Sequence, residues 1–275
     1  MTRQVRQPRA RAFHAALTGA AGGAFSGLTG VGGGAIMVPL LTSRLNLGQH
    51  RAHGTSLAII TFVAASGVVG YWHAGNIDWR LVLALAPGGV LGVYAGARTM
   101  LRLPALQVRL LFGAFLLFVA FRQLVWHVSA GAPQGGIAGV LIATGFGFAG
   151  GALAGVLGVG GGAIFVPAII IFGLAHVARG EDPQKVAQGV SLVVIVCTGL
   201  AGSITNWRQR TIDVATVRWV VPVAVAAALS ASLLANRMDA AILKAVYGVT
   251  ALALACQVLY TTARAFRGRP LIAEV

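Results

Sequence analysis

The stretch GLTGVGGGAIMVP, residues 27–39, returns later in the chain as GVLGVGGGAIFVP, residues 155–167. Over a longer window, residues 19–39 and 147–167 are identical at 15 of 21 positions at a constant offset of 128. A duplicated segment of this length indicates that the chain consists of two like halves. The duplicated part is a glycine run that leads into an apolar segment. In membrane proteins, paired interruptions at equivalent points of two halves point to a binding site.

The composition predicts an all-α polytopic membrane protein. Of the 275 residues, 57% are apolar and only 10% are charged, and the mean hydropathy is +0.82. A soluble domain needs more polar surface than this. Apolar stretches such as residues 81–97, 110–121 and 214–234 approach or reach the length of about 20 residues that crosses a bilayer as a helix.

The net charge of +15 raises the possibility of nucleic-acid binding, but the basic residues lie between the apolar segments. Basic residues at membrane borders are what the positive-inside rule predicts, so a nucleic-acid partner is excluded. The basic N-terminus resembles a signal peptide, yet the segment that follows it has a counterpart deep in the chain. We therefore expect a retained first helix.

The repeat continues beyond the glycines at an offset of 135, where Ser56 and Leu57 match Ser191 and Leu192. The expected organisation is a basic cytoplasmic N-terminus at 1–12, a first repeat at 13–128, a linker at 129–136, a second repeat at 137–262 and a basic cytoplasmic tail at 263–275. Each repeat holds five apolar segments. They are expected at 13–28, 35–48, 53–73, 80–99 and 108–128, and at 137–157, 163–177, 187–207, 214–236 and 241–262.

The first two segments of each half are expected to be short and to be separated by the glycine run. They form either one broken crossing or a pair that crosses an even number of times. The even number inverts the two halves relative to each other and places 15 of the 21 basic residues on the cytoplasmic side. One crossing gives parallel halves and a count of 12 against 9. The positive-inside rule thus favours two inverted repeats with both termini in the cytoplasm.

The glycine run predicts an anion site. Glycine permits backbone conformations that other residues resist, so the run can unwind between two helical pieces. The N–H groups and the dipole of the helix that begins after the run then favour an anion in the gap. The backbone donors expected in this site are Gly30, Gly32, Gly33, Gly34 and Ala35, and their counterparts Gly158, Gly160, Gly161, Gly162 and Ala163.

Glycines at four-residue spacing, such as Gly19, Gly23 and Gly27, are typical of close helix packing instead, and we expect that role for them. The run also fits a loose dinucleotide-binding pattern. That pattern requires a preceding strand and a downstream acidic residue, and this context is missing. No cofactor and no metal site are expected.

Side-chain donors for an anion are expected at the start of the third segments, in RAHGTSL and VAQGVSL: Thr55, Ser56, Gln188 and Ser191. His53 is expected at the membrane interface and solvated. Trp72 and Trp207 lie near segment ends and are expected to be interfacial anchors, with a gate as the alternative. All six acidic residues fall in loops or at segment ends, so a coupling proton would reside on the substrate or on a histidine.

These glycine runs, each followed by an apolar pair and a proline (Pro39, Pro167), and the HGTSL and QGVSL segments resemble the sulfite exporter family TauE/SafE. The resemblance extends from about residue 15 to residue 259. It implies a permease of the bacterial inner membrane that exports sulfite or a small organosulfonate such as sulfoacetate.

The sequence therefore predicts a multi-pass exporter of a small sulfur oxyanion that works by alternating access, with the lipid bilayer and the small anion as its partners. A passive anion channel, or a permease for another small anion, is the alternative. A membrane-embedded scaffold or enzyme is a third hypothesis. The enzyme is weakly supported, because no nucleophile–base pair is visible within the segments. The sequence indicates no oligomeric state.

Overall fold

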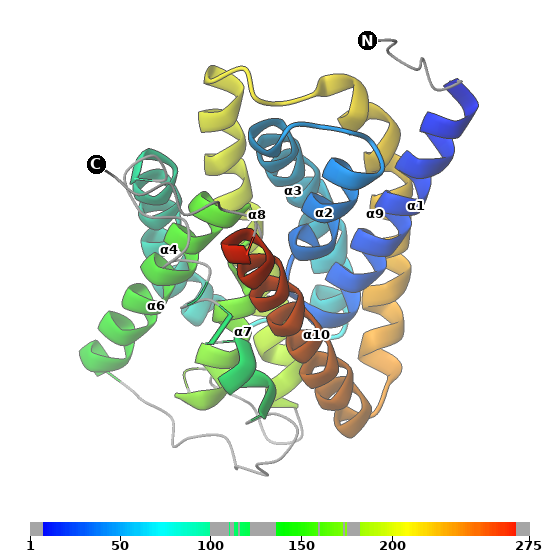
Figure 1. Ribbon diagram of the computed structural model, residues 1–275. Helices are drawn as coiled ribbons and strands as arrows, with labels where there is room; N and C mark the ends of the chain where they lie inside the picture. The colour runs from blue at the N-terminus through cyan, green and yellow to red at the C-terminus, as the bar shows by residue number, and fades with distance from the viewer. Residues whose placement is uncertain are drawn as a thin grey trace, which may run out of the picture.

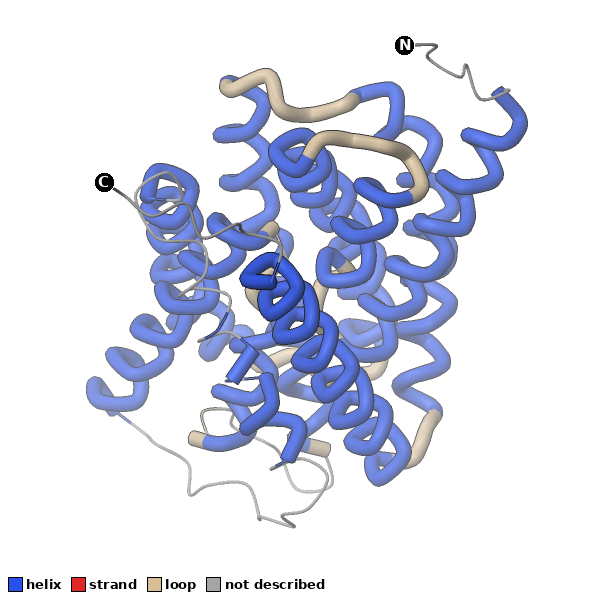
Figure 2. Tube along the Cα trace, viewed as in Figure 1, coloured by secondary structure: helices blue, strands red, loops and turns tan. Residues whose placement is uncertain are grey.

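The computed structural model describes residues 8–99, 110, 113–114, 116–121, 136–158, 160–172, 174 and 182–267. Every regular element in these ranges is helical (Figures 1 and 2). In the first half the helices are α1 (Pro8–Thr29), α2 (Gly34–Ser43), α3 (Gln49–His73) and α4 (Trp79–Thr99). In the second half they are α6 (Gly136–Leu157), α7 (Gly162–Ile171), α8 (Pro183–Arg208), α9 (Val214–Arg237) and α10 (Ala240–Arg267).

Nine of the ten expected segments thus appear as helices in the described part of the chain. Six of these helices are long and apolar enough to span a membrane: α3, α4, α6, α8, α9 and α10. The tenth expected segment, 108–128, lies mostly outside the described residues, although residues 116–121 within it are helical. The fold is therefore that of a polytopic helical membrane protein.

The expectation that the first segment of each half is short is wrong. Helices α1 and α6 each have 22 residues, a length of about 33 Å. The start of α1 contains the basic residues Arg9 and Arg11 and is not apolar. The prediction from apolar runs therefore placed the start of this helix too late, at residue 13. The second segments are short, because α2 and α7 have 10 residues each. A helix of this length reaches only about 15 Å, half of the hydrocarbon core.

The most extensive contacts between a helix of the first half and a helix of the second half have counterparts in which the two halves swap roles. Helix α1 packs along α9, and its counterpart α6 packs along α4. Helix α3 packs on α9 as α8 packs on α4, and α3 and α8 pack on each other at the centre. Helices α2 and α7 each pack on the third helix of their own half.

The expected packing role of the glycine ladders is confirmed. A Cβ added at Gly19 would lie 2.7 Å from the carbonyl oxygen of Val220 on α9. One added at Gly155 on α6 would lie 2.6 Å from the carbonyl oxygen of Val93 on α4. Backbone therefore meets backbone along both pairs, which only residues without side chains permit.

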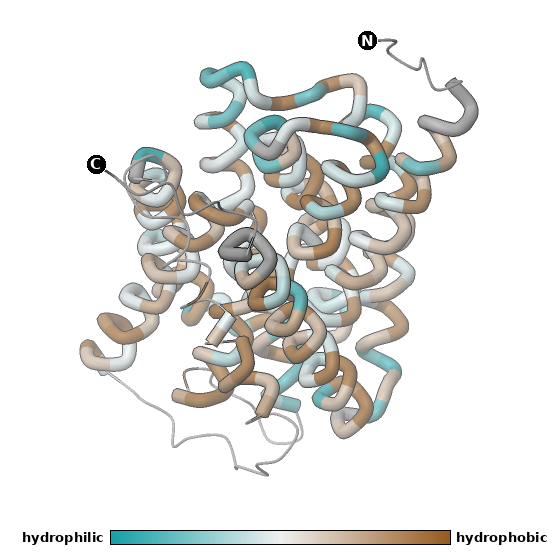
Figure 3. The backbone as a smooth tube through the Cα atoms, in the orientation of Figure 1, coloured by the Kyte–Doolittle hydropathy of each residue, from teal (hydrophilic) through white to brown (hydrophobic). Residues whose placement is uncertain are grey.

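Helices α1 and α2 meet in the interior, while the start of α1 and the end of α2 lie toward the same end of the molecule (Figure 1). The loop from α2 to α3 and the loop from α8 to α9 lie at this end too, and the turn from α9 to α10 lies at the other. Helix α3 therefore runs opposite to α8. Figure 3 shows hydrophilic residues gathered in the two loops and apolar residues along the helices.

Candidate functional site

Both glycine runs interrupt a helix in the same way. In the first loop the φ angles of Gly30, Gly32 and Gly33 are 69°, 95° and 71°. In the second loop Gly158, Gly160 and Gly161 have φ angles of 68°, 91° and 78°. These are left-handed conformations, which glycine adopts without the steric cost paid by other residues. The last of each trio is the N-cap of the following short helix, α2 or α7.

The N–H groups at the starts of the short helices have no hydrogen-bond partner among the described residues. Gly30 and Gly158 donate back to Ser26 and Ala154, as the last N–H groups of α1 and α6. Within the described chain, the following N–H groups have no hydrogen-bond partner: those of Gly32, Gly33, Gly34 and Ala35, and those of Gly160, Gly161, Gly162 and Ala163. All six of these glycines are buried. Buried donors without partners, at the positive end of a helix, favour an anion.

The two loops meet at the centre of the protein. A Cβ added at Gly162 would lie 2.5 Å from the carbonyl oxygen of Gly30. One added at Gly160 would lie 3.7 Å from the Cα atom of Gly32 and 3.4 Å from Ile60. Ile195, the counterpart of Ile60, flanks Gly32 in the same manner, at 3.2 Å. The starts of the two short helices therefore lie close together in the structure.

Each loop is held by a serine of the other half. Ser191 on α8 donates to the carbonyl oxygen of Gly30 at 2.7 Å, and Ser56 on α3 donates to that of Gly158 at 3.5 Å. Both serines are fully buried. Both hydroxyls donate to loop carbonyls, so the two serines position the loops.

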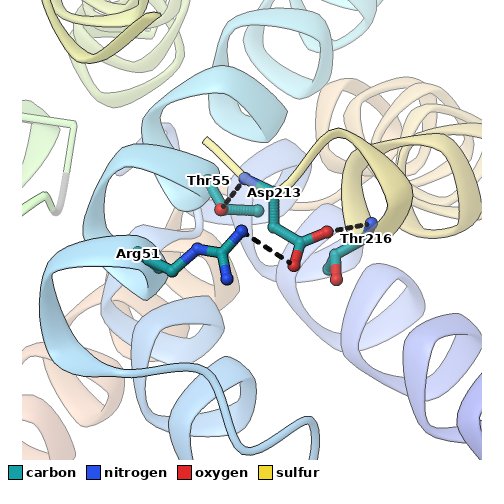
Figure 4. Close-up of polar contacts among 4 residues, drawn as sticks. All are labelled: Arg51, Thr55, Asp213 and Thr216. Atoms are coloured by element: carbon teal, nitrogen blue, oxygen red, sulfur yellow. Dashed lines mark hydrogen bonds and ion pairs between the residues drawn. The ribbon is translucent and has the colours of Figure 1, made fainter. Parts of the chain in front are cut away.

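Thr55, expected among the anion donors, is buried in the second turn of α3 and lies beside the start of α9 (Figure 4). Its hydroxyl oxygen accepts a hydrogen bond from the N–H of Asp213 at 2.9 Å. Asp213 caps α9 by accepting from the N–H of Thr216 at 3.0 Å, and its other carboxylate oxygen lies 3.7 Å from Nη2 of Arg51. The repeat counterparts of Thr55 and Arg51 are valines, so this cluster belongs to one half only.

Gln188 lies beside the first loop, as expected for a donor. A Cβ added at Gly30 would lie 2.8 Å from its Cα atom. Its Oε1 accepts from the hydroxyl of Tyr71 at 2.8 Å, while its buried Nε2 has no partner among the described residues. Ser26, whose Cβ would lie 3.4 Å from a Cβ at Gly33, likewise has a buried hydroxyl without a partner there.

The sequence did not single out Ser26 and Tyr71 as site residues. Neither has an identical counterpart in the second half, where Ala154 and Asn206 occupy the equivalent positions. A search that relies on duplicated residues therefore passes over them. For Ser26 the available signal is its helical spacing of four residues from Gly30, whereas Tyr71 lies on another helix and has no such signal.

The expectation that His53 is solvated is wrong. His53 is 6% exposed and lies against the second loop, since a Cβ at Gly158 would be 2.8 Å from Cδ2 of its ring. His53 is the counterpart of Gln188 at the offset of 135. Helix α3 begins at Gln49, so residue 53 is already one turn inside the protein rather than at its edge.

Trp72 and Trp207 lie at equivalent ends of α3 and α8, and each is 64% exposed. Side chains this exposed lie on the surface of the helix bundle, and their role as interfacial anchors stays a prediction.

Among the described residues, the site contains no buried carboxylate. The buried polar side chains of the described chain belong to threonine, serine, histidine, asparagine and glutamine, with no aspartate, glutamate, lysine or arginine among them. In the same residues no three His, Cys, Asp or Glu side chains lie together as a metal site would require. Donors from backbone and amide groups, together with two helix dipoles, therefore set the electrostatics of the gap.

Known proteins are similar in sequence to this chain along most of its length. The sequence profile described as "Sulfite exporter TauE/SafE" matches residues 15–182 and again residues 142–273. A "Probable membrane transporter protein" of Xylella fastidiosa strain 9a5c is 26% identical over 246 residues, which cover 85% of this chain and 89% of that protein. The "Probable membrane transporter protein YunE" of Bacillus subtilis strain 168 is 22% identical over 262 residues, which cover 86% of this chain and 93% of that protein.

No solved structure gives a significant match. The family profile covers nearly all of the chain in two overlapping matches. The chain therefore belongs to the TauE/SafE sulfite exporter family of membrane transporters.

Proposed function

We propose that this protein exports a small sulfur oxyanion, sulfite or an organosulfonate such as sulfoacetate, across the bacterial inner membrane. The observation that carries the proposal is the pair of buried glycine loops. Each offers four N–H groups without partners, and the described interior around them contains no acidic side chain. An oxyanion has several acceptor oxygens and can satisfy several such donors at once, without a buried cation.

We further propose that the two halves are inverted repeats and that both termini are cytoplasmic. The opposite directions of α3 and α8 support this, as do the matched helix pairings. Arg44 and Arg210 lie in the two loops at the end where α1 begins, so the positive-inside rule assigns that end to the cytoplasm. Alternating access then follows from one half tilting against the other around the fixed loops.

A passive anion channel is the second candidate. Its support is the absence of acidic side chains from the buried polar residues of the described chain, since coupled pumps commonly use such groups. A carrier saturates and shows counterflow, whereas a channel does neither. Sulfite uptake into proteoliposomes preloaded with sulfite, sulfate or chloride separates the two. Uptake accelerated by one preloaded anion supports the carrier.

The loops themselves are tested by Gly160→Ala. A methyl group there has room, because the nearest atoms lie at 3.4–3.7 Å, but it enters the gap between the loops and meets a φ of 91°. We expect flux to fall at least tenfold while the protein stays folded. Gly145→Ala on α6 is the control, since a Cβ there meets nothing within 4 Å. Unchanged flux in a folded Gly160→Ala variant contradicts the proposal.

A further inference from the structure

The two glycine loops differ in the side chain that lies against them. Gln188 of α8 lies against Gly30 in the first loop, and its repeat counterpart, His53 of α3, lies against Gly158 in the second. An amide is neutral at every pH, whereas an imidazole changes its charge near neutral pH. Equivalent places in the two half-sites are therefore held by a neutral group in one and a titratable group in the other.

The position of His53 brings its ring to the anion-binding part of the loop. A Cβ at Gly158 would lie 2.8 Å from Cδ2 and 2.9 Å from Nε2 of the ring. Gly158 precedes by two residues the first of the N–H groups without partners, that of Gly160. Ser56, less than one turn further along α3, donates to the carbonyl oxygen of Gly158. Residues 52–60 of the helix are all buried, so this place is shielded from bulk water.

We propose that His53 binds one proton together with the anion held at the second loop. The inference rests on the proposed function and adds a proton-binding residue to it. The proton comes from the water on the side from which the anion enters, and it leaves to the water on the other side when the anion leaves. An imidazolium attracts the anion, and by linkage the anion favours the imidazolium to the same extent. Gln188, at the equivalent place beside the first loop, binds no proton.

Other charged groups surround α3, and they are carried by the four helices that pack on it. Among the described side chains, the charged and titratable groups of these helices and of α3 itself are His14 (α1), Arg44 (end of α2), Asp182, Lys185, Cys197 and Arg208 (α8 and its cap), Asp213, Arg218 and Arg237 (α9 and its cap), and His50, Arg51, Tyr71 and His73 (α3). Of the two acids among them, Asp213 is engaged by Arg51, Thr55 and Thr216, and Asp182 accepts from the N–H of Gln184 at the start of α8. The arginine and lysine side chains among them are positive, and they raise the local anion concentration at every pH.

The test compares the half-saturating sulfite concentration for flux into proteoliposomes at pH 5.5 and pH 8.0 in the wild type and in His53→Gln. This substitution places beside the second loop the residue type that already lies beside the first loop. Sulfite itself titrates in this range, but identically for both proteins, so the ratio of the two concentrations isolates the residue. We expect the ratio of His53→Gln to wild type to rise about tenfold between pH 8.0 and pH 5.5. His73→Gln, at the exposed end of the same helix, is the matched control and keeps the wild-type profile.

The outcomes separate the two proposals. No sulfite flux by the wild type at either pH contradicts the proposed function. Flux with a ratio that does not change with pH overturns the role of His53 and leaves the proposed function standing. If His53→Gln does not fold, Gln188→His provides the second test. It should acquire an additional increase in sulfite affinity at pH 5.5, and a folded Gln188→His variant with the wild-type pH profile overturns the inference.

Discussion

At the scale of single residues, the two serines that hold the loops are expected to contribute unequally. Ser191 donates to the carbonyl oxygen of Gly30 at 2.7 Å, whereas Ser56 donates to that of Gly158 at 3.5 Å. A buried acceptor that loses a good hydrogen bond costs about 1–2 kcal/mol, and a long, poor bond costs less. We expect Ser191→Ala to lower the unfolding free energy in detergent more than Ser56→Ala does. Equal losses in an SDS titration would show that the two loops are held alike.

The cluster at the start of α9 provides a second comparison, because two side chains of α3 contact the same aspartate (Figure 4). Thr55 accepts from the N–H of Asp213, and Thr55→Val, which introduces the residue found in the second half, leaves that donor without a partner. We expect a loss of about 1–2 kcal/mol.

The side chain of Arg51 is 58% exposed and its ion pair with Asp213 is 3.7 Å long. Water screens a pair of this kind, and such pairs contribute at most about 0.5 kcal/mol. Arg51→Ala therefore serves as the control for Thr55→Val in the same unfolding measurement. A larger loss for Arg51→Ala than for Thr55→Val would mean that the ion pair, rather than the threonine, holds this end of the bundle.

Some residues of the site could be predicted from the sequence around them, and others could not. The glycines were predictable, because three consecutive glycines destabilise a helix and because the run recurs in the second half. The surroundings of His53 were not, because its burial depends on the second loop, more than 100 residues further along the chain. The same holds for the serines, since a sequence shows a hydroxyl but not the distant carbonyl to which it donates.

At the scale of helices, the glycine ladders predict a sharp difference between two alanine substitutions. At Gly27 of α1 a Cβ would lie 2.8 Å from that of Ala231 and 2.9 Å from the N atom of Ser232 on α9. Gly27→Ala therefore pushes α1 away from α9, and we expect a loss of about 1–3 kcal/mol. At Gly145 of α6 the same substitution meets open space, and the higher helix propensity of alanine should leave stability unchanged or raise it by up to about 1 kcal/mol. Thermal midpoints in detergent test the pair, and equal midpoints would contradict close packing of α1 on α9.

Helix positions were largely predictable, since a run of about 20 apolar residues has few other stable forms in a bilayer. The start of α1 could not be predicted from apolar residues, because the helix begins with basic residues that can lie outside the hydrocarbon core. Helices α2 and α7 have ten residues each, whereas the segments predicted for them had 14 and 15 residues. Pro39 and Pro167 lie inside these short helices and do not end them.

At the scale of the whole molecule, the two halves depend on each other. The first loop is held by α8 through Ser191 and Gln188, and the second loop is held by α3 through Ser56 and His53. Each half thus supplies a loop and completes the site of the other. A half expressed alone would lack the side chains that fix its own loop, so the site requires both halves.

The inverted arrangement makes a prediction about membrane sidedness that single cysteines can test. Four exposed positions mark the two ends: Ser43 and Gln209 at the end where α1 begins, Ala74 and Arg237 at the other. In a background with Cys197→Ser and Cys256→Ser, each position is changed to cysteine and treated with a maleimide that does not cross membranes. We expect Ser43→Cys and Gln209→Cys to react only in inside-out vesicles, and Ala74→Cys and Arg237→Cys only in spheroplasts. If all four react from the opposite sides, the charge-based orientation is wrong while the inverted repeat holds. If Ser43→Cys and Gln209→Cys react from different sides, the halves are not inverted, and the two helix starts cannot reach one anion site from opposite faces of the membrane.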